Sequence, residues 1–356
     1  MSSSAVASIR QRSGKCRAES ITMAHGSGGK AMRDLIDDVF VAAFDNDELN
    51  KLEDQARFDL SALSAAGDRL AMTTDSYVVD PLFFPGGDIG KLAITGTVND
   101  LAVGGAIPLY LTCGMIIEEG MLVDDLRRIA QSMRKTADEA GVKIVTGDTK
   151  VVPRGAADKL FINTAGVGVI PTGINIGTHR AQPGDVVLIN GYVGDHGAAI
   201  VDARGEMALD NTIETDCQPL NDLIQSMLEI CPDIHCMRDA TRGGIATVLN
   251  EFAQGSNTCI RLDENTLPIR NEVRGMCEIL GLDPLYLANE GKVIAIVPAD
   301  AAEKTLAVMR EHPAGLNSAI VAEVSEKPES TVILSTTFGG ERIVDMLVGE
   351  QLPRIC

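Results

Sequence analysis

Helix-type and strand-type patterns of apolar residues alternate along most of the chain. Apolar residues that recur at intervals of three and four predict helices, and short continuous apolar runs predict strands. In the first half, helices are expected at about 32–44, 91–106 and 122–141, and strands at 69–79, 109–117, 142–149 and 159–170. In the second half, helices are expected at 219–230, 243–253, 271–280 and 301–311, and strands at 186–190, 235–239, 258–262 and 292–298, with closing strands after them. This alternation predicts an α/β or α+β fold.

A turn signal separates two expected domains. The sequence AQPGD at 181–185 places Pro, Gly and Asp ahead of a new strand. A chain of 356 residues is long enough for two domains, which we expect at 22–180 and 181–345. Residues 1–21 are serine-rich and basic without apolar periodicity, so they are expected to be disordered or to be a start-site or expression extension. Residues 346–356 are expected to form a mobile tail.

Composition narrows the function classes. The net charge of −19 argues against a nucleic-acid partner, because binding to a phosphate backbone needs clustered Lys and Arg. A nucleotide ligand would need divalent cations held by carboxylates to offset the repulsion. No apolar run approaches the roughly 20 residues of a membrane span and no secretory signal pattern opens the chain, so we expect a cytoplasmic protein without a membrane partner. The eight cysteines form no C-x-x-C pair, which disfavours a zinc framework.

The glycine-rich segment HGSGGK at 25–30 invites comparison with a phosphate-binding loop. It does not fit the P-loop pattern, because only two residues separate Gly26 from Gly29 and Ala follows Lys30. Two interpretations remain open on local grounds. The loop amides and Lys30 can fold over an anion, or the segment is a plain flexible linker.

Four aspartates lie at or beside the ends of expected apolar elements. They are Asp75, Asp80, Asp100 and Asp148. In α/β folds such positions face the ligand, and carboxylates gathered from several elements repel unless a hard cation joins them. The alternative for each one is a solvated aspartate at a turn or a helix cap.

Two further motifs carry candidate chemistry in the second half. In DATRGG at 239–244, Asp239 and Thr241 can cap a helix, and Arg242 adds a donor fork suited to phosphate. In NEGK at 289–292, Glu290 and Lys292 precede an apolar strand and suggest either a surface ion pair or a base in a site.

The motifs together resemble the HypE family of hydrogenase maturation proteins. This family belongs to the superfamily of aminoimidazole ribonucleotide synthetase (PurM-like), thiamine-monophosphate kinase and selenophosphate synthetase. The resemblance runs from about Met23 to Cys356 and is carried by AHGSGGKAM, TTDSYVVDPLFFPGGDIGKLAITGTVNDLAVGGAIP, GDTKVV, RGAADKLFINTAG, GDHGAAI, RDATRGG, NEGK and the terminal PRIC. The PRIC tail is the specific part, since the other superfamily members lack it. The resemblance implies a homodimer in which the N-terminal lobes share a β-barrel, with ATP near that interface.

The resemblance also implies a reaction on the chain's own tail. A HypF-type carbamoyltransferase is expected to attach a carboxamide to Cys356, and this chain would then dehydrate it to a thiocyanate with ATP and Mg²⁺. The cyano group would pass to iron on a HypC–HypD scaffold for a [NiFe]-hydrogenase. Such chemistry needs metal carboxylates, a cation at the transferring phosphoryl group and a base at the amide nitrogen.

Residue roles follow from matching the family's motifs. The catalytic positions implied are Cys356, with Glu290 to take the amide proton and Lys150 and Arg242 to stabilise charge. The metal positions implied are Asp75, Asp100 and Asp148. The nucleotide positions implied are Gly28, Gly29, Lys30, Asp75, Asn99, Asp100, Asp148 and Thr149.

Two other functions compete with this one. A small-molecule kinase or synthetase of the same superfamily, of the thiamine-monophosphate kinase or selenophosphate synthetase type, would use the same ATP site and would not need Cys356. A non-catalytic thiol carrier would bind metal or a partner through the tail, and it would leave the aspartates and Lys150 without a purpose.

Overall fold

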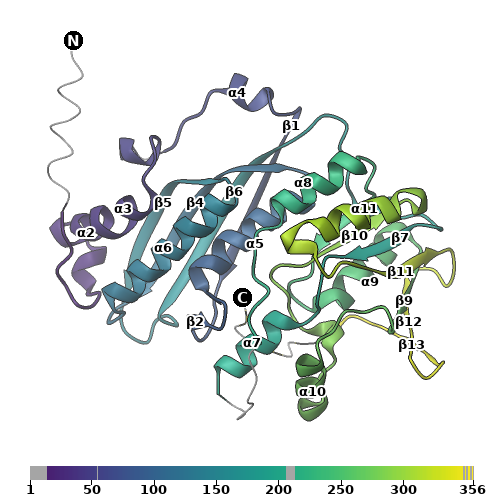
Figure 1. Cartoon of the computed structure of the whole chain (residues 1–356). Helices are drawn as coiled ribbons and strands as arrows, with labels where there is room; N and C mark the ends of the chain where they lie inside the picture. Colours follow the sequence, from purple (N-terminus) through teal and green to yellow (C-terminus); the bar gives the residue numbers. More distant parts are fainter. Residues whose placement is uncertain are drawn as a thin grey trace.

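The structure is a computed structural model that describes residues 14–53, 55–205 and 213–347, together with 349, 352 and 355. It contains two lobes that lie side by side (Figure 1). Cys356 and residues 1–13 lie outside the described residues. Residues 14–21, part of the expected N-terminal extension, contact the first lobe. Ile21 is fully buried and its backbone N–H donates to the Met121 carbonyl.

The N-terminal lobe contains a four-stranded sheet with the order β1-β6-β4-β5. Only β4 and β5 are parallel, and helix α6 connects them. Helices α5 and α6 pack together on one face of the sheet (Figure 1). The elements are β1 (Arg69–Tyr77), β4 (Ile107–Glu118), β5 (Lys143–Val152), β6 (Leu160–Ile170), α5 (Ile89–Val103) and α6 (Val123–Glu139).

Shorter elements precede and interrupt this sheet. The helix expected from about residue 32 is confirmed, and its middle section is π-helical. A small hairpin leads into α5. These elements are η2 (Met23–Gly26), α2 (Lys30–Leu35), η3 (Ile36–Val41), α3 (Ala42–Phe44), η4 (Leu49–Lys51), α4 (Leu60–Ser64), β2 (Phe83–Phe84) and β3 (Gly87–Asp88).

The C-terminal lobe contains a seven-stranded mixed sheet with the order β13-β12-β9-β11-β7-β10-β8. Helices α8 and α11 pack together with one apolar cluster of this lobe, and α9 belongs to another. The strands are β7 (Val186–Ile189), β8 (Cys236–Asp239), β9 (Cys259–Asp263), β10 (Val293–Val297), β11 (Ala319–Ser325), β12 (Thr331–Ser335) and β13 (Glu341–Ile343). The helices are η5 (Thr178–Arg180), α7 (Asp195–Ala203), α8 (Asn221–Ile230), α9 (Gly244–Ser256), α10 (Asn271–Leu280), η6 (Pro284–Tyr286), α11 (Ala299–Glu311) and η7 (Pro313–Gly315).

Helix α5 connects the two lobes. The Asp88 side chain caps its start by accepting hydrogen bonds from the Gly90 and Lys91 backbone N–H groups, at 2.7 and 3.1 Å. The helix is buried almost all round, because it packs on β1 and β6 of its own lobe and on α8 and β8 of the other. The close approach of α5 to β1 requires a small residue at position 96, because a Cβ atom at Gly96 would lie 2.3 Å from the Tyr77 hydroxyl oxygen. The helix therefore fixes the relative position of the lobes.

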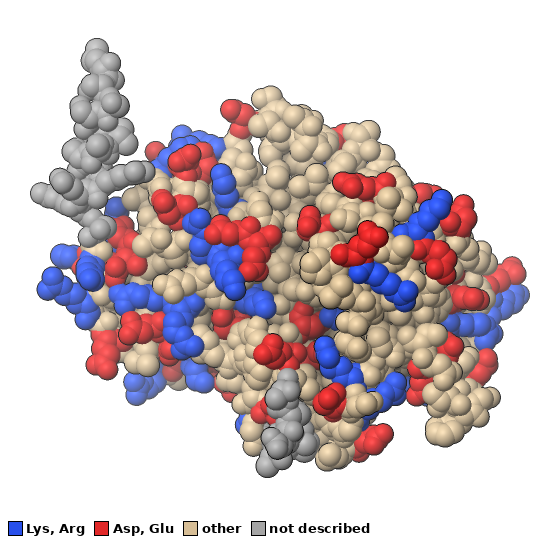
Figure 2. All heavy atoms as spheres, in the orientation of Figure 1, with Lys and Arg blue, Asp and Glu red and all other residues tan. Residues whose placement is uncertain are grey.

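The second face of the N-terminal sheet carries exposed apolar side chains in the part of the chain that the structure describes. Leu70, Met72 and Ile116 are exposed, with Leu70 and Met72 at alternate positions of β1. The expected β-barrel shared by two chains would close this face, and it stays a prediction. In the part of the chain that the structure describes, no helix is both long and apolar enough to cross a membrane. On the face shown in Figure 2, basic side chains are interspersed with acidic ones.

The structure gives Asn99 a role in joining the lobes. Its side-chain amide donates to the carbonyls of Gln218 and Glu290, at 3.2 and 3.3 Å, and its oxygen accepts from the Leu220 N–H at 2.8 Å. Asn99 is 1% exposed, so these backbone groups have no water to replace it.

Asn99→Ala is therefore expected to lower the free energy of unfolding by about 2–3 kcal/mol, because buried backbone groups lose their partner. Urea denaturation measures the change. The matched control is Asn50→Ala, whose side chain is exposed and should change stability by less than about 0.5 kcal/mol. Equal small changes in both variants would contradict this role.

Candidate functional site

Four acidic side chains meet at the junction of the lobes. Asp75 comes from β1 and Asp100 from α5, whereas Asp239 ends β8 and Glu290 precedes β10. Each of Asp100, Asp239 and Glu290 is under the electrostatic influence of at least one other member. We call these four residues the acidic cluster.

Strand pairing brings the two C-terminal members together. Strands β8 and β10 are antiparallel, and Val293 pairs with Asp239. The pairing continues into the loops, since the Ala240 N–H donates to the Lys292 carbonyl and the Asn289 N–H donates to the Ala240 carbonyl. The motifs DATRGG and NEGK, which are some 50 residues apart in sequence, therefore lie against each other.

Burial and mutual repulsion raise the pKa values in the acidic cluster. Burial, followed by the charge of Asp100, raises the pKa of Asp239 to about 7. Burial, followed by the charge of Asp239, holds the pKa of Glu290 well above its ordinary value. Burial is also the main cause of the raised pKa of Asp100, and a 2.8 Å hydrogen bond from the Thr73 hydroxyl opposes it. Added positive charge would relieve this repulsion.

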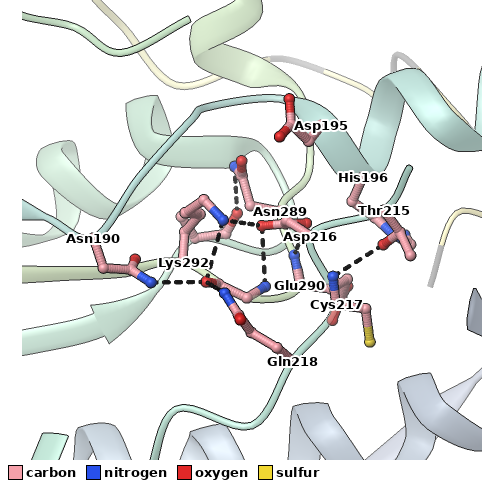
Figure 3. Close-up of polar contacts among 12 residues, drawn as sticks. Asn190, Asp195, His196, Thr215, Asp216, Cys217, Gln218, Asn289, Glu290 and Lys292 are labelled. Carbon is pink, nitrogen blue, oxygen red and sulfur yellow. Dashed lines mark hydrogen bonds and ion pairs between the residues drawn. The ribbon is translucent and has the colours of Figure 1, made fainter. Parts of the chain in front are cut away.

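A buried ion pair fixes the loop that carries Glu290 (Figure 3). The Asp216 carboxylate accepts from the N–H groups of Glu290 and Gly291, at 3.0 and 3.1 Å, and from the Lys292 ammonium at 2.9 Å. Burial alone would raise the pKa of Asp216, but the charge of Lys292 and the hydrogen bond from the Glu290 N–H lower it below its ordinary value. The Asp216 anion is therefore a permanent anchor of the loop.

The Glu290 side chain is buried, and one of its carboxylate oxygens is available for a ligand. It is 3% exposed, and its Oε1 has no hydrogen-bond partner among the described residues. The charge of Glu290 adds to burial in raising the pKa of the neighbouring Cys217 thiol. A surface ion pair between Glu290 and Lys292 is the wrong interpretation of NEGK, because both side chains are buried and Lys292 pairs with Asp216. A desolvated carboxyl oxygen with no partner is suited to accept a proton from a bound group.

The capping interpretation of DATRGG is also wrong. Gly243 is the N-cap of α9 and no side chain caps the helix. Gly243 and Gly244 both have positive φ, and a Cβ atom at Gly244 would lie 2.4 Å from the Leu285 carbonyl oxygen. Asp239 belongs instead to the acidic cluster, and Arg242 forms a 3.1 Å ion pair with Asp75.

Asp148 does not join Asp75 and Asp100 within one chain. Asp75 lies on β1 and Asp148 on β5, which are the opposite edges of the sheet. Three strand spacings separate these edges, about 14 Å, whereas a shared metal ion binds its oxygen ligands at about 2–2.6 Å. Among the described residues, no group of three or more His, Cys, Asp or Glu side chains is arranged to hold a metal ion. The expected trio is therefore not assembled in one subunit. Asp80 also lies apart, in an ion pair with Lys159.

The glycine-rich segment at 25–30, called the glycine loop below, lies beside β5. A Cβ atom at Gly26 would lie 2.8 Å from Cβ of Val151, so the loop packs directly on this strand. The loop is anchored by buried His25, whose Nδ1 accepts from the Thr22 N–H at 3.0 Å. Beyond this anchor, Gly28 has open space around it and the exposed Lys30 side chain pairs only with Asp34 among the described residues.

A cavity of about 530 Å³ opens between the N-terminal helical segment and β5. Its lining includes Asp148 and Thr149 together with the apolar side chains of Phe40, Cys113 and Met115. Lys150 is exposed on the open face of the sheet, where it is the cross-strand partner of Ile116. One chain thus presents two separate regions, the acidic cluster and the region around β5.

The tail returns to the first of these regions. Ile355 is 7% exposed and belongs to the same buried cluster as Cys217 and Ala288. Its carbonyl oxygen lies 2.8 Å from Nε2 of His196. At this position the expected mobile tail is docked against the chain, and its last residue, Cys356, lies outside the described residues.

Sequence reasoning missed Asp216, Asp239 and His196 as parts of the site. Asp239 lies in the same motif as Arg242, but the sequence indicated a helix cap there. Asp216 stands in a segment without a chemical motif, and its partners are 74 to 76 residues further along the chain. His196 in GDHG matches no metal-ligand spacing, and its contact with Ile355 spans 159 residues. A pattern along the chain carries no signal for contacts at such separations.

Family models match both lobes. Residues 53–170 match the N-terminal domain of AIR synthase related proteins, and residues 182–335 match the C-terminal domain. Among curated proteins, the carbamoyl dehydratase HypE of Rhodobacter capsulatus is 55% identical over 96% of this chain and 99% of its own length. The carbamoyl dehydratase HypE of Escherichia coli K12 is 53% identical over 94% and 99%.

Solved structures agree with these matches. A crystal structure of the hydrogenase maturation protein HypE in complex with ATP covers 94% of this chain and 99% of its own, at 50% identity and a TM-score of 0.89. The HypE chain of a HypE–HypF complex covers 86% and 97%, at 47% identity and a TM-score of 0.76. A thiamine monophosphate kinase of Aquifex aeolicus, at 19% identity and a TM-score of 0.58, shares the fold alone. The chain belongs to the HypE family of carbamoyl dehydratases, within the AIR synthase related proteins.

Proposed function

We propose that this chain is an ATP-dependent carbamoyl dehydratase that acts on its own C-terminus. It converts an S-carboxamide on Cys356 into an S-thiocyanate and so supplies the cyanide ligand for the iron of a [NiFe]-hydrogenase. The observation that carries the proposal is the docking of Ile355, the residue before Cys356, beside the loop that holds Glu290. Identity of 50% or more to HypE proteins, one of them solved with ATP, supports it.

The proposed reaction breaks the C–O bond and both N–H bonds of the amide. Transfer of the ATP γ-phosphoryl group to the amide oxygen creates a good leaving group, and loss of both N–H protons with departure of phosphate leaves the nitrile. The net change is carboxamide plus ATP to thiocyanate, ADP, phosphate and a proton. Glu290 is proposed to take the amide proton, because its Oε1 is buried and lacks a partner among the described residues. Its raised pKa makes the deprotonated form a stronger base than an ordinary carboxylate.

Mg²⁺ is proposed to bind at the acidic cluster through two of its carboxylates, together with the triphosphate. Asp75 and Asp100 offer the hard carboxylate oxygens that Mg²⁺ prefers, and the repulsion that raises the pKa of Asp100 would be relieved by a cation. Bound with the triphosphate, Mg²⁺ would neutralise charge on the transferring phosphoryl group. Arg242, paired with Asp75, is proposed to stabilise the same charge.

The region around β5 is proposed to hold the nucleotide. The cavity beside Asp148 and Thr149, which combines apolar and polar side chains, suits a base, and the anchored glycine loop with Lys30 can close over phosphates. In this region Lys150 is proposed to stabilise charge. Gly28 and Gly29 are proposed to contact the nucleotide. For Asn99, the buried hydrogen bonds between lobes favour a structural role over contact with the nucleotide.

A homodimer is proposed through the open face of the N-terminal sheet. The exposed Leu70, Met72 and Ile116 on this sheet are the kind of apolar surface that a second copy would cover. The same face carries Lys150, so a partner subunit is the proposed route by which the β5 residues reach an acidic cluster. A HypF-type carbamoyltransferase is the proposed donor of the carboxamide, supported by the solved HypE–HypF complex, and a HypC–HypD scaffold is the proposed acceptor of the cyano group.

A test of the function follows the mass of the tail. After incubation with the carbamoyltransferase, carbamoyl phosphate and ATP, then desalting, the Cys356 peptide is expected to carry a carboxamide. Added Mg²⁺ and ATP should convert it to a species lighter by one water, and Cys356→Ala should form neither product. Nucleotide turnover on a small molecule by the Cys356→Ala protein, with no modification of the wild-type tail, would favour the kinase or synthetase alternative.

Glu290→Gln is expected to slow the dehydration step by about 10²- to 10⁴-fold, because the proton acceptor is lost. Since burial and Asp239 raise the pKa of Glu290, its basic form increases as the pH rises, and the wild-type single-turnover rate should increase with pH up to that raised pKa. The Gln variant should lose this dependence while still binding ATP. A Gln variant with the wild-type rate and pH profile would rule out Glu290 as the base.

Asp100→Asn is expected to raise the Mg²⁺ concentration needed for half-maximal activity by roughly tenfold or more, as removal of a metal-site carboxylate does. Asp125→Asn on the exposed surface of α6 is the control, since its carboxylate contacts only Arg128 among the described residues. Activity measured against Mg²⁺ concentration at fixed ATP separates them. Identical Mg²⁺ profiles would remove Asp100 from the metal site.

A further inference from the structure

The described part of the tail is held at two points. The Ile355 side chain is buried, and Leu352 packs on apolar clusters of both the N-terminal and the C-terminal regions. The Ile355 backbone contact is the more specific one, because its carbonyl oxygen lies 2.8 Å from Nε2 of His196. His196 itself is completely buried.

The two ring nitrogens of His196 have different hydrogen-bonding roles, one as donor and one as acceptor. A carbonyl oxygen only accepts, so Nε2 of His196 carries the proton and donates to Ile355. Nδ1 of a neutral ring is then an acceptor, and the Thr215 hydroxyl, 2.8 Å away, donates to it. The Thr215 oxygen in turn accepts from the Cys217 N–H at 3.1 Å. Burial lowers the pKa of His196 and keeps the ring in this neutral form.

The helix that carries His196 is tied to the Glu290 loop. The Gly197 N–H donates to the Ala288 carbonyl at 3.0 Å, and the Gly194 N–H donates to the Asn289 side chain at 2.7 Å. Gly197 permits this approach, since a Cβ atom there would lie 3.2 Å from Cβ of Leu287. The donor to the tail and the loop of the proposed base are therefore joined by two hydrogen bonds.

Apolar contacts surround the same donor. Phe84 meets the His196 ring edge-on, with 5.7 Å between ring centroids. Ile200 follows His196 by one helical turn on α7, and it belongs to the same buried cluster as Ile355. Neither contact depends on the chemical group attached to Cys356.

We propose that His196 and Thr215 are a positioning pair that seats the C-terminal tail by its backbone. His196 holds the Ile355 carbonyl and the buried Ile355 side chain sets the depth, so the seat fixes the residue that directly precedes Cys356. The seat recognises the backbone and one aliphatic side chain, so it accepts the tail whatever the cysteine carries. This inference rests on the proposed function, since it gives the seated tail a role in dehydration.

The first test measures how readily the Cys356 thiol reacts in the free protein. The seven described cysteines are all buried, so a maleimide reagent should modify Cys356 preferentially, and tail-peptide mass spectrometry identifies the product. His196→Met removes the donor at similar size, and it is expected to raise the modification rate by roughly three- to tenfold, the effect of losing one hydrogen bond. His196→Gln keeps an N–H near the Nε2 position and should stay within about twofold of the wild-type rate.

Two further pairs repeat the contrast at other parts of the seat. Thr215→Val removes the hydroxyl that orients the ring and should behave like His196→Met, whereas Thr215→Ser should behave like the wild type. Ile355→Ser should raise the rate and Ile355→Val should not. Ile355 lies next to the chain end, so these variants keep the test valid if a His196 variant fails to fold, as judged by thermal unfolding.

The second test measures single-turnover dehydration of protein that already carries the carboxamide. His196→Met and Thr215→Val should lower the rate at saturating ATP without changing the apparent KM for ATP, and their conservative partners should restore it. Equal Cys356 modification rates in the wild type, His196→Met and Ile355→Ser would overturn the seat. Gln and Met variants that are equally impaired would also overturn it. A Cys356 that is shielded by the seat but never converted to thiocyanate would instead contradict the proposed function.

Discussion

The packing of helix α5 between the lobes is the constraint on which the site depends. One side of the helix contacts β1 and β6, and the other contacts α8 and β8. This contact places Asp100 between Asp75 of one lobe and Asp239 of the other, so the acidic cluster exists only when the lobes are joined. The hydrogen bonds of Asn99 to Gln218, Leu220 and Glu290 fix this contact between the lobes.

One buried carboxylate at this junction, that of Asp216, is stabilised as an anion. The anionic forms of the other buried carboxyl groups there are destabilised. Asp216 has an ammonium group and two backbone N–H groups, and its pKa is lowered. For Glu290 and Asp239, burial and the charges of neighbouring carboxylates dominate, and their pKa values are raised. The difference separates a structural carboxylate from groups that can exchange protons or bind a cation near neutral pH.

The proposed seat for the tail lies next to the framework that carries the acidic cluster. The His196 ring, the Thr215 hydroxyl and the Glu290 loop are connected through α7 and the segment around Asp216, so the seat and the acidic cluster share one framework. Tail recognition through a backbone carbonyl leaves the chemistry of the cysteine side chain unconstrained. A group that is altered during the reaction needs this freedom, because its shape and hydrogen-bonding capacity change at each step.

The sequence by itself determined the order of helices and strands, the two-lobe organisation and the family, because apolar periodicity and contiguous motifs are local signals. It also singled out Asp75, Asp100, Arg242 and Glu290 as candidates, because they lie in such motifs. Only the tertiary structure decided which of these side chains meet: it separated Asp148 from Asp75 by placing their strands at opposite edges of a sheet, and it recruited Asp216, Asp239 and His196. Those contacts depend on strand order and lobe packing, which join residues far apart in the chain and leave no periodic trace in it.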